Sequence, residues 1–229
     1  MDVSTIPAAR ESKHSELPAS QIFPQLIRAA DLQPLQPITG DEKGGSHFNL
    51  EQLRGRLVEL SSTRPAACLS LSCTLLLEAQ KLSTPVIWIS VTRDSFYPPD
   101  LAANGIDLSL VPVVWVPDIR SAIRAADQLL RTGSFGLLVI DLYRNARLPM
   151  SLQAPLARLT HRHGCVVCFL TTKPEASPSL GSMISLYARA SRSRSKSGRF
   201  RLEVRVVKDK RRAPVWRHVE LMHGPPGLC

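Results

Sequence analysis

Residues 135–141 read FGLLVID, a continuous apolar run that ends in a carboxylic acid. A strand that is apolar on both faces is typical of a parallel sheet with helices on each side. A shorter run of the same kind covers Leu57–Leu60. Three further apolar runs cover Val86–Val91, Val111–Val116 and Cys165–Leu170. The sequence therefore predicts a central, mostly parallel sheet.

The segments between these runs have the spacing of helices. Within Ile119–Arg131, apolar residues recur at intervals of three and four, so that they share one helical face. Helical patterns also cover Ala66–Lys81 and Leu152–His161. Strands that alternate with helices predict an α/β fold with helices on both faces of the sheet.

The pattern changes after Leu186. Phe200–Val207 reads FRLEVRVV, in which apolar and charged residues alternate, and Val215–Met222 follows after a basic turn. This predicts a C-terminal antiparallel hairpin with one face in water. The run Ser191–Ser197 (SRSRSKS) predicts a mobile polar loop. We interpret it either as a solvated loop or as a clamp for phosphate groups.

Two short segments flank the predicted core of residues 47–223. Residues 1–46 are predicted to form an arm with an amphipathic helix over Ser20–Leu32 and a linker over Thr39–Ser46, and residues 224–229 form a tail. The helix suggests docking onto a protein partner, and the alternative is packing on its own domain. The candidate partner-binding residues on this helix are Ile22, Phe23 and Leu26.

The positive charge of the chain is concentrated in one segment. The 229 residues carry a formal net charge of +10. Between residues 189 and 217 lie twelve of the 29 Lys and Arg residues but only two of the 19 Asp and Glu residues, so the rest of the chain is neutral. A neutral body with one basic segment predicts a polyanionic partner, with DNA or RNA ahead of an acidic membrane.

The composition narrows the class of protein. With 44% hydrophobic and 21% charged residues, a wholly disordered or fibrous chain is excluded. No apolar run is long enough to span a bilayer, and the N-terminus lacks the apolar region of a secretory signal. We therefore expect a cytoplasmic protein whose five cysteines are reduced thiols.

One segment has the layout of a phosphate-binding loop without its chemistry. Gly55–Leu71 predicts a strand, a turn with Pro65 and a helix. The working motif, G-x-x-x-x-G-K-[ST], needs glycines to turn backbone N–H groups inward, a lysine for the phosphate charge and a hydroxyl for the metal. Here all four required positions are substituted: Ser62 and Ala67 replace the glycines, Cys68 the lysine and Leu69 the hydroxyl.

Several segments in the same order resemble the RecA superfamily, over roughly residues 48–223. The similar segments are GRLVEL (Gly55–Leu60), GIDLSL (Gly105–Leu110), LLVIDL (Leu137–Leu142), CFLTTKPE (Cys168–Glu175) and VRVVKDKRRAP (Val204–Pro214). The resemblance implies a RecA-like core in which Asp141 is the surviving Walker B acid. The catalytic glutamate of the family falls at Thr92 or Arg93, and its sensing glutamine falls at Thr172. We therefore expect a degenerate Walker A site, no cofactor and no enzyme activity.

Within that superfamily the chain is similar to the ImuA proteins of translesion synthesis and to the related SulA proteins. The resemblance implies a non-enzymatic adaptor in the bacterial SOS response to DNA damage, located at the nucleoid, with RecA or an ImuB-type polymerase subunit as partner. The alternatives are a SulA-like inhibitor of cell division and a weak ATPase with a rebuilt site. The candidate DNA-binding residues, which would contact phosphates with little sequence preference, are Arg192, Arg194, Lys196, Arg199, Arg201, Lys208, Lys210, Arg211 and Arg212.

The resemblance also places the second DNA-binding loop of the family at Lys173–Ser182, where Lys173 is the only basic residue. Ordered strand pairing of the RecA type is therefore not expected. Other candidate sites are weak. The pair Cys165 and Cys168 would face opposite sides of one strand, and the pair His161 and His163 lacks companion ligands, so neither predicts a metal site.

Overall fold

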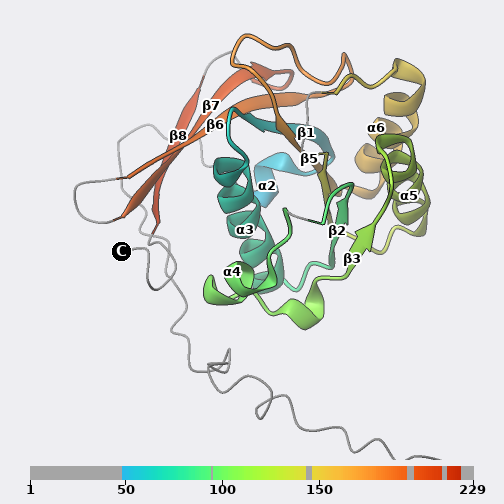
Figure 1. The fold of residues 1–229 in the computed structure, drawn as a ribbon. Helices are drawn as coiled ribbons and strands as arrows, with labels where there is room; N and C mark the ends of the chain where they lie inside the picture. The colour runs from blue at the N-terminus through green and yellow to red at the C-terminus, as the bar shows by residue number, and fades with distance from the viewer. Residues whose placement is uncertain (1–47, 94, 143–145, 195–198, 213–215, 223–229) are drawn as a thin grey trace, which may run out of the picture. The chain divides into compact units, whose positions relative to one another are not determined.

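The computed structural model describes residues 48–93, 95–142, 146–194, 199–212 and 216–222. Its centre is an eight-stranded sheet in the order β3-β2-β4-β5-β1-β6-β7-β8 (Figure 1). The strands are β1 (Arg56–Ser62), β2 (Val86–Ser90), β3 (Val113–Trp115), β4 (Leu137–Asp141), β5 (Val166–Thr172), β6 (Leu186–Arg194), β7 (Phe200–Asp209) and β8 (Arg217–Met222). The strands from β3 to β6 in this order pair in parallel, and β7 and β8 pair antiparallel. The predicted α/β class and the C-terminal hairpin are confirmed.

The helices fall between the strands as the sequence predicts. They are α2 (Leu50–Leu53), α3 (Pro65–Lys81), α4 (Pro98–Ala103), the 3₁₀ helix η2 (Leu108–Leu110), α5 (Ile119–Thr132) and α6 (Met150–His163). The ends of α5 have clear local causes. The carboxylate of Asp118 accepts a hydrogen bond of 2.8 Å from the N–H of Ser121. Gly133 ends the helix with φ +67°, a conformation that glycine adopts without strain.

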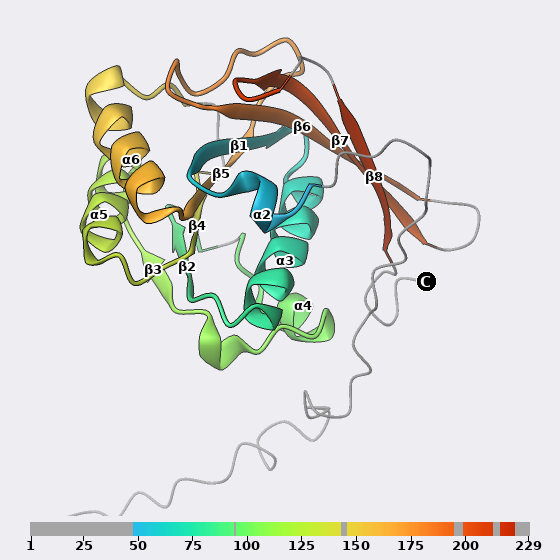
Figure 2. The same cartoon turned by 180° about the vertical axis from the view of Figure 1, so that it is seen from behind.

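Two hydrophobic layers cover the sheet, and alternate residues of each strand enter different layers. In β4, Leu137 and Val139 pack in the layer with α2 and α3, whereas Leu138 and Ile140 pack in the layer with α5 and α6. Figures 1 and 2 show these helices on opposite sides of the sheet. We call the two sides the α3 face and the α5–α6 face. This double burial explains why the central strands are apolar throughout.

The C-terminal part of the sheet, β6–β8, is covered differently, and we call it the extension. Residues of β7 at alternate positions, Leu202, Val204 and Val206, pack in the layer of the α3 face. The residues between them are half-buried or exposed. The alternating pattern of the sequence follows from this covering of one face only.

The prediction of a mobile polar loop over Ser191–Ser197 is wrong for its first half. Strand β6 continues through Arg194, and Arg192 and Arg194 lie opposite Leu202 and Phe200 of β7. The polar residues belong to the strand because backbone pairing with β7 holds them there, even though their side chains are exposed. Residues 195–198, including Lys196, lie outside the described part.

A β-bulge interrupts the pairing of β6 with β7. Tyr187 lies opposite Lys208, but Ala188 lies opposite Val206, so Val207 is an extra residue, 45% exposed. Beyond this point Asp209 forms a buried ion pair with Arg56 of β1. Burial alone would raise the pKa of Asp209, but hydrogen bonds, first among them that from Arg56, hold it below its usual value.

Several sequence predictions concern residues that the structure does not describe. They are the N-terminal arm with its candidate partner-binding residues, the linker and the C-terminal tail, and they stay predictions: Ile22, Phe23, Leu26, and residues 1–46 and 224–229.

Candidate functional site

The segment with the layout of a phosphate-binding loop has a turn that is too short to surround a phosphate group. Strand β1 ends at Ser62 and α3 begins at Pro65, so only Thr63 and Arg64 connect them. The hydroxyl of Ser62 donates a hydrogen bond of 2.5 Å to the carbonyl of Arg64. A working loop needs a longer turn that directs several backbone N–H groups at one anion. Here the hydrogen bond from the Ser62 hydroxyl to the Arg64 carbonyl closes the turn.

The position of the missing lysine holds a neutral, buried group. Cys68 is 2% exposed and its thiol donates to the Ser62 hydroxyl at 3.2 Å. Burial raises the pKa of Cys68 to about 12, so the thiol stays protonated at neutral pH. Ala67 is buried beside it, and Leu69 is packed against the core of the α3 face. A phosphate in this position would meet no cation from these residues.

The other positions suggested by the RecA resemblance do come together at the carboxyl end of the parallel strands. Asp141 lies opposite Ser90, and Ser62 lies opposite Thr172. Asp141 is only 2% exposed. Of the two positions that replace the catalytic glutamate, Thr92 donates its backbone N–H to the Ser90 hydroxyl. Neither it nor an exposed Arg93 supplies a carboxylate base.

The sequence did not reveal a buried ion pair near this edge. Lys173 follows β5 and pairs with Glu59 in the middle of β1, and both side chains are fully buried. Glu59 also accepts hydrogen bonds from the Thr171 hydroxyl at 2.9 Å and from the Leu180 N–H at 2.7 Å. Lys173 donates a further bond to the carbonyl of Pro178. The one basic residue of the predicted second DNA-binding loop is thus inaccessible to phosphate.

Arg189 also holds the loop that follows β5, through hydrogen bonds to its backbone. It is 7% exposed and donates to the Ser61 hydroxyl at 3.1 Å and to the carbonyl of Lys173 at 3.2 Å. It also donates to the carbonyls of Pro174 and Glu175. The loop after β5 is therefore held by internal contacts rather than left open for a ligand.

The twelve basic residues of the segment 189–217 have different surroundings. Three of them are buried or ion-paired within the protein, which makes them less available to bind a phosphate. Arg189 is buried, Arg205 pairs with Glu175 at 2.7 Å, and Arg217 pairs with Glu203 at 2.7 Å. These three lie outside the set of candidate DNA-binding residues.

Most of the described candidates retain an uncompensated charge. Arg192 donates to the Ser70 hydroxyl, Arg211 to the carbonyls of Arg54 and Gly55, and the ammonium groups of Lys208 and Lys210 both to the carbonyl of Ser182. These acceptors are neutral. Within the described ranges, three further candidates form no ion pair: Arg194, Arg199 and Arg201.

The candidate residues do not share one face of the extension. Arg192 and Arg194 lie on the α3 face, opposite Leu202 and Phe200. Arg201 lies on the other face, where it is opposite Ser193. The turn after β7 brings Arg211 against the backbone of Arg54, at the amino end of β1. The positive charge therefore lies on both faces and at both ends of the extension rather than in one flat patch, and we call this set of residues the basic rim: Arg192, Arg194, Arg199, Arg201, Lys208, Lys210 and Arg211.

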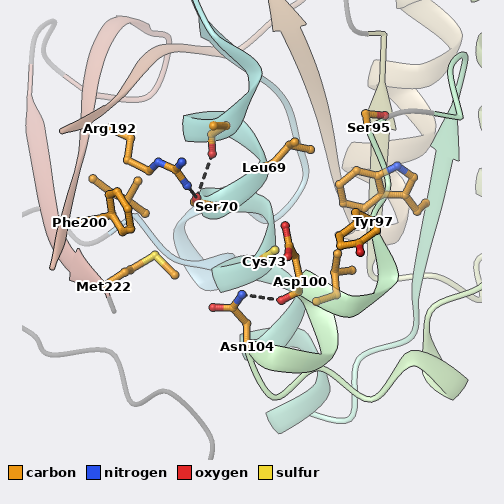
Figure 3. A pocket seen from close by; sticks show the side chains of 14 residues that line it. Leu69, Ser70, Cys73, Ser95, Tyr97, Asp100, Asn104, Arg192, Phe200 and Met222 are labelled. Atoms are coloured by element: carbon orange, nitrogen blue, oxygen red, sulfur yellow. Dashed lines mark hydrogen bonds between the residues drawn. The ribbon is translucent and has the colours of Figure 1, made fainter. Parts of the chain in front are cut away.

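A pocket of about 190 Å³ opens on the α3 face, between α3, α4 and the extension (Figure 3). Figure 3 shows Arg192, Phe200 and Met222 on one side of α3 and Ser95 and Tyr97 on the other. No sequence motif pointed to this pocket, because its lining comes from six separate parts of the chain. The lining residues are Ala66, Leu69, Ser70, Cys73, Trp88, Ser95, Tyr97, Asp100, Leu101, Asn104, Arg192, Phe200, Leu202 and Met222.

The weaker candidate sites can be placed as well. Cys165 packs on the α5–α6 face and Cys168 on the α3 face, so the two thiols point apart. Among the described residues, no group of three His, Cys, Asp or Glu side chains is arranged to hold a metal ion. The described helices include none with the length and hydropathy to cross a membrane.

Comparison with protein-family models and with curated proteins gives no match to the chain.

Proposed function

We propose that the chain is a non-enzymatic adaptor that binds DNA through the basic rim of the extension. The observation that carries this proposal is the charge of the rim. Arg194, Arg199 and Arg201 have no ion-pair partner within the described ranges, and the side chains of Lys210 and Arg211 donate only to neutral carbonyls there. Cations in this state are free to exchange counterions for phosphates, which favours binding to any nucleic-acid sequence.

A RecA-like ancestry and a place in the bacterial response to DNA damage complete the proposal. A mostly parallel sheet that ends in an antiparallel hairpin supports the first part. The closed β1–α3 turn and the buried thiol of Cys68 support an adaptor over an ATPase. The proposed partners are DNA, RecA and an ImuB-type polymerase subunit, and the basic rim favours this function over a SulA-like inhibitor, which has no need of DNA.

The salt dependence of binding tests the proposal. If about five cations touch phosphates, the slope of log K against log salt on duplex DNA is about −4 to −5. The triple variant R194Q/R199Q/R201Q is expected to flatten this slope by about one unit for each substituted arginine that touches a phosphate in the wild type, for all sequences alike.

The matched control removes three positive charges elsewhere. Arg120 and Arg124 on α5 and Arg162 on α6 are exposed and form no ion pair within the described ranges, and both helices lie on the opposite side of the sheet from α3 (Figure 2). The variant R120Q/R124Q/R162Q has the same net charge as the test variant, and its slope is expected to match that of the wild type. Equal slopes for both variants would contradict the proposal, because binding would then follow net charge and not the rim.

A further inference from the structure

The pocket on the α3 face lies next to the basic rim. Arg192 belongs to both, since it lines the pocket and is one of the candidate DNA-binding residues. Its guanidinium carbon lies 4.6 Å from the centre of the Phe200 ring, and its Nη1 lies 3.3 Å from the Ser70 hydroxyl of α3. The side chain thus spans the gap between the extension and α3 and closes one end of the pocket.

The size of the pocket limits what can enter it. An apolar cavity of about 150 Å³ holds one benzene ring, and this pocket has about 190 Å³. It has room for a single ring system and not for a helix or for two stacked bases.

The walls suit a flat ring with hydrogen-bonding edges. Leu69, Leu202 and Met222 supply apolar surface, and Phe200 supplies an aromatic ring. Tyr97 is a second ring at the pocket, and it is 58% exposed. Bases of single-stranded nucleic acids stack on rings of this kind, and neighbouring cations then meet their phosphates.

Polar groups on α3 and α4 complete the lining. They are the Ser70 hydroxyl, the Asn104 amide and the exposed carboxylate of Asp100. The Ser70 hydroxyl donates to the Ala66 carbonyl and accepts from Arg192, and the Asn104 amide donates to the Asp100 carbonyl. The Asp100 carboxylate accepts no hydrogen bond within the described ranges. An aliphatic side chain would offer this carboxylate no donor, whereas the amino group on the edge of a base would.

We propose that this pocket receives one nucleobase of single-stranded DNA, with the neighbouring phosphates on the rim. The inference rests on the DNA-binding function proposed above and adds to it a preference for single strands. The carboxylate of Asp100 favours bases with an exocyclic amino group, cytosine, adenine or guanine, because a carboxylate accepts hydrogen bonds and donates none.

The test compares two twelve-residue strands with the same number of phosphates. One consists of deoxycytidines, and the other has abasic sugars at every position. Fluorescence anisotropy at two salt concentrations gives both affinities. The wild type is expected to bind the cytidine strand about tenfold more tightly, within the range for one base stacked on an aromatic side chain. The ratio is expected to hold at both salt concentrations, because the phosphates are equal in number.

Variants locate the effect. Tyr97→Ala removes an exposed ring from the pocket and is expected to bring the ratio down to about twofold. Leu110→Ala is the control, because Leu110 is 55% exposed and is not part of the lining, and its ratio should equal that of the wild type. Thermal unfolding checks that both variants fold.

The outcomes separate the two proposals. Equal affinity of the wild type for the two strands overturns the base pocket and favours a protein side chain as its occupant. A ratio that Tyr97→Ala leaves unchanged also overturns it, because the bases would then bind elsewhere. Failure to bind either strand while duplex DNA still binds also overturns the base pocket alone, whereas failure to bind duplex DNA as well, or binding without salt dependence, overturns the proposed DNA-binding function itself.

Discussion

Glu59, in the middle of β1, and Lys173, directly after β5, form a buried ion pair. The pair places two charges where apolar side chains could pack. It also holds the loop that follows β5, because Glu59 accepts a hydrogen bond from the Leu180 N–H and Lys173 donates one to the Pro178 carbonyl. Two buried charges lose much hydration energy, and their attraction offsets this loss only while both are present. The pair therefore fixes the loop without adding much to stability.

A double-mutant cycle tests this account. Glu59→Leu leaves the Lys173 ammonium buried without its partner, and it is expected to lower the free energy of unfolding by about 3–5 kcal/mol. The double variant E59L/K173M removes both charges and is expected to recover most of that loss. Urea denaturation measures both values. If the double variant were as unstable as the single one, the role assigned to the pair would be wrong.

Cys68 and Leu69 allow a test of the phosphate loop. The protein is expected neither to bind nor to hydrolyse ATP, and the double variant C68K/L69T is expected not to restore binding. The reason is the length of the connection, because two residues between β1 and α3 cannot form the cradle that the lysine serves. Isothermal titration calorimetry with ATP and Mg²⁺ should show no heat of binding for either protein. Micromolar binding by the wild type would contradict the prediction.

At the scale of the element, β8 packs a carboxylate against α3. Glu220 is 8% exposed, and burial raises its pKa, with a further rise caused by the charge of Glu78 on α3. Burial also raises the pKa of Glu78, although the Leu50 N–H partly offsets this. The folded state therefore holds protons on these groups more firmly than the unfolded state does.

The raised pKa of Glu220 determines the direction in which the stability of the protein changes with pH. For a carboxyl group with a raised pKa, the folded state loses stability as pH rises from the unfolded value through the folded one. Glu220→Gln removes this cost, so its Tm at pH 7 is expected to rise by about a few degrees, and the gain should vanish at acid pH. Thermal unfolding between pH 4 and 8 measures the change. Glu175→Gln, at an exposed position whose charge acts on neither Glu78 nor Glu220, is the control and should leave the profile nearly unchanged, because it breaks only a surface ion pair with Arg205.

The elements differ in how well the sequence predicts them. The strands from β1 to β5 and the helices α3, α5 and α6 were predictable, because buried faces impose apolar residues at regular spacing. Strand β6 was missed, because it carries the polar run Ser191–Arg194 and is held there by pairing with β7. Contacts such as Glu59–Lys173 were not predictable, since only the alignment of β1 beside β5 brings the two residues together.

For the whole molecule, the candidate site also has some features that the sequence predicts and others that only the fold reveals. That the lysine and the hydroxyl of a phosphate-binding loop are replaced follows from Cys68 and Leu69 in the sequence alone, because it depends on residue type. The division of the basic segment into paired and unpaired cations could not, because it depends on where Glu175 and Glu203 lie in space. The pocket beside α3 needed the fold for the same reason.

The assembly of the molecule is a further expectation. In the RecA-like proteins that the sequence resembles, filaments depend on nucleotide at the subunit interface. A chain with a closed β1–α3 turn is therefore expected to remain a monomer or a small oligomer in the presence of DNA and ATP. Light scattering measures the mass of the particles. Long regular filaments would contradict this expectation.

The bulge at Val207 has a consequence for how the chain tolerates change. Because the Val207 side chain is 45% exposed, Val207→Thr should change the Tm of the protein by no more than about one degree. Deleting its codon should also be tolerated, because Val207 is the extra residue: Lys208 would follow Val206 directly and keep its place opposite Tyr187, and Asp209 would stay opposite Leu186 and near Arg56. Deleting Val204 is another matter, because Arg205 would then turn to the side that α3 covers. A library of single-codon deletions should therefore retain folded protein at Val207 and lose it at Val204.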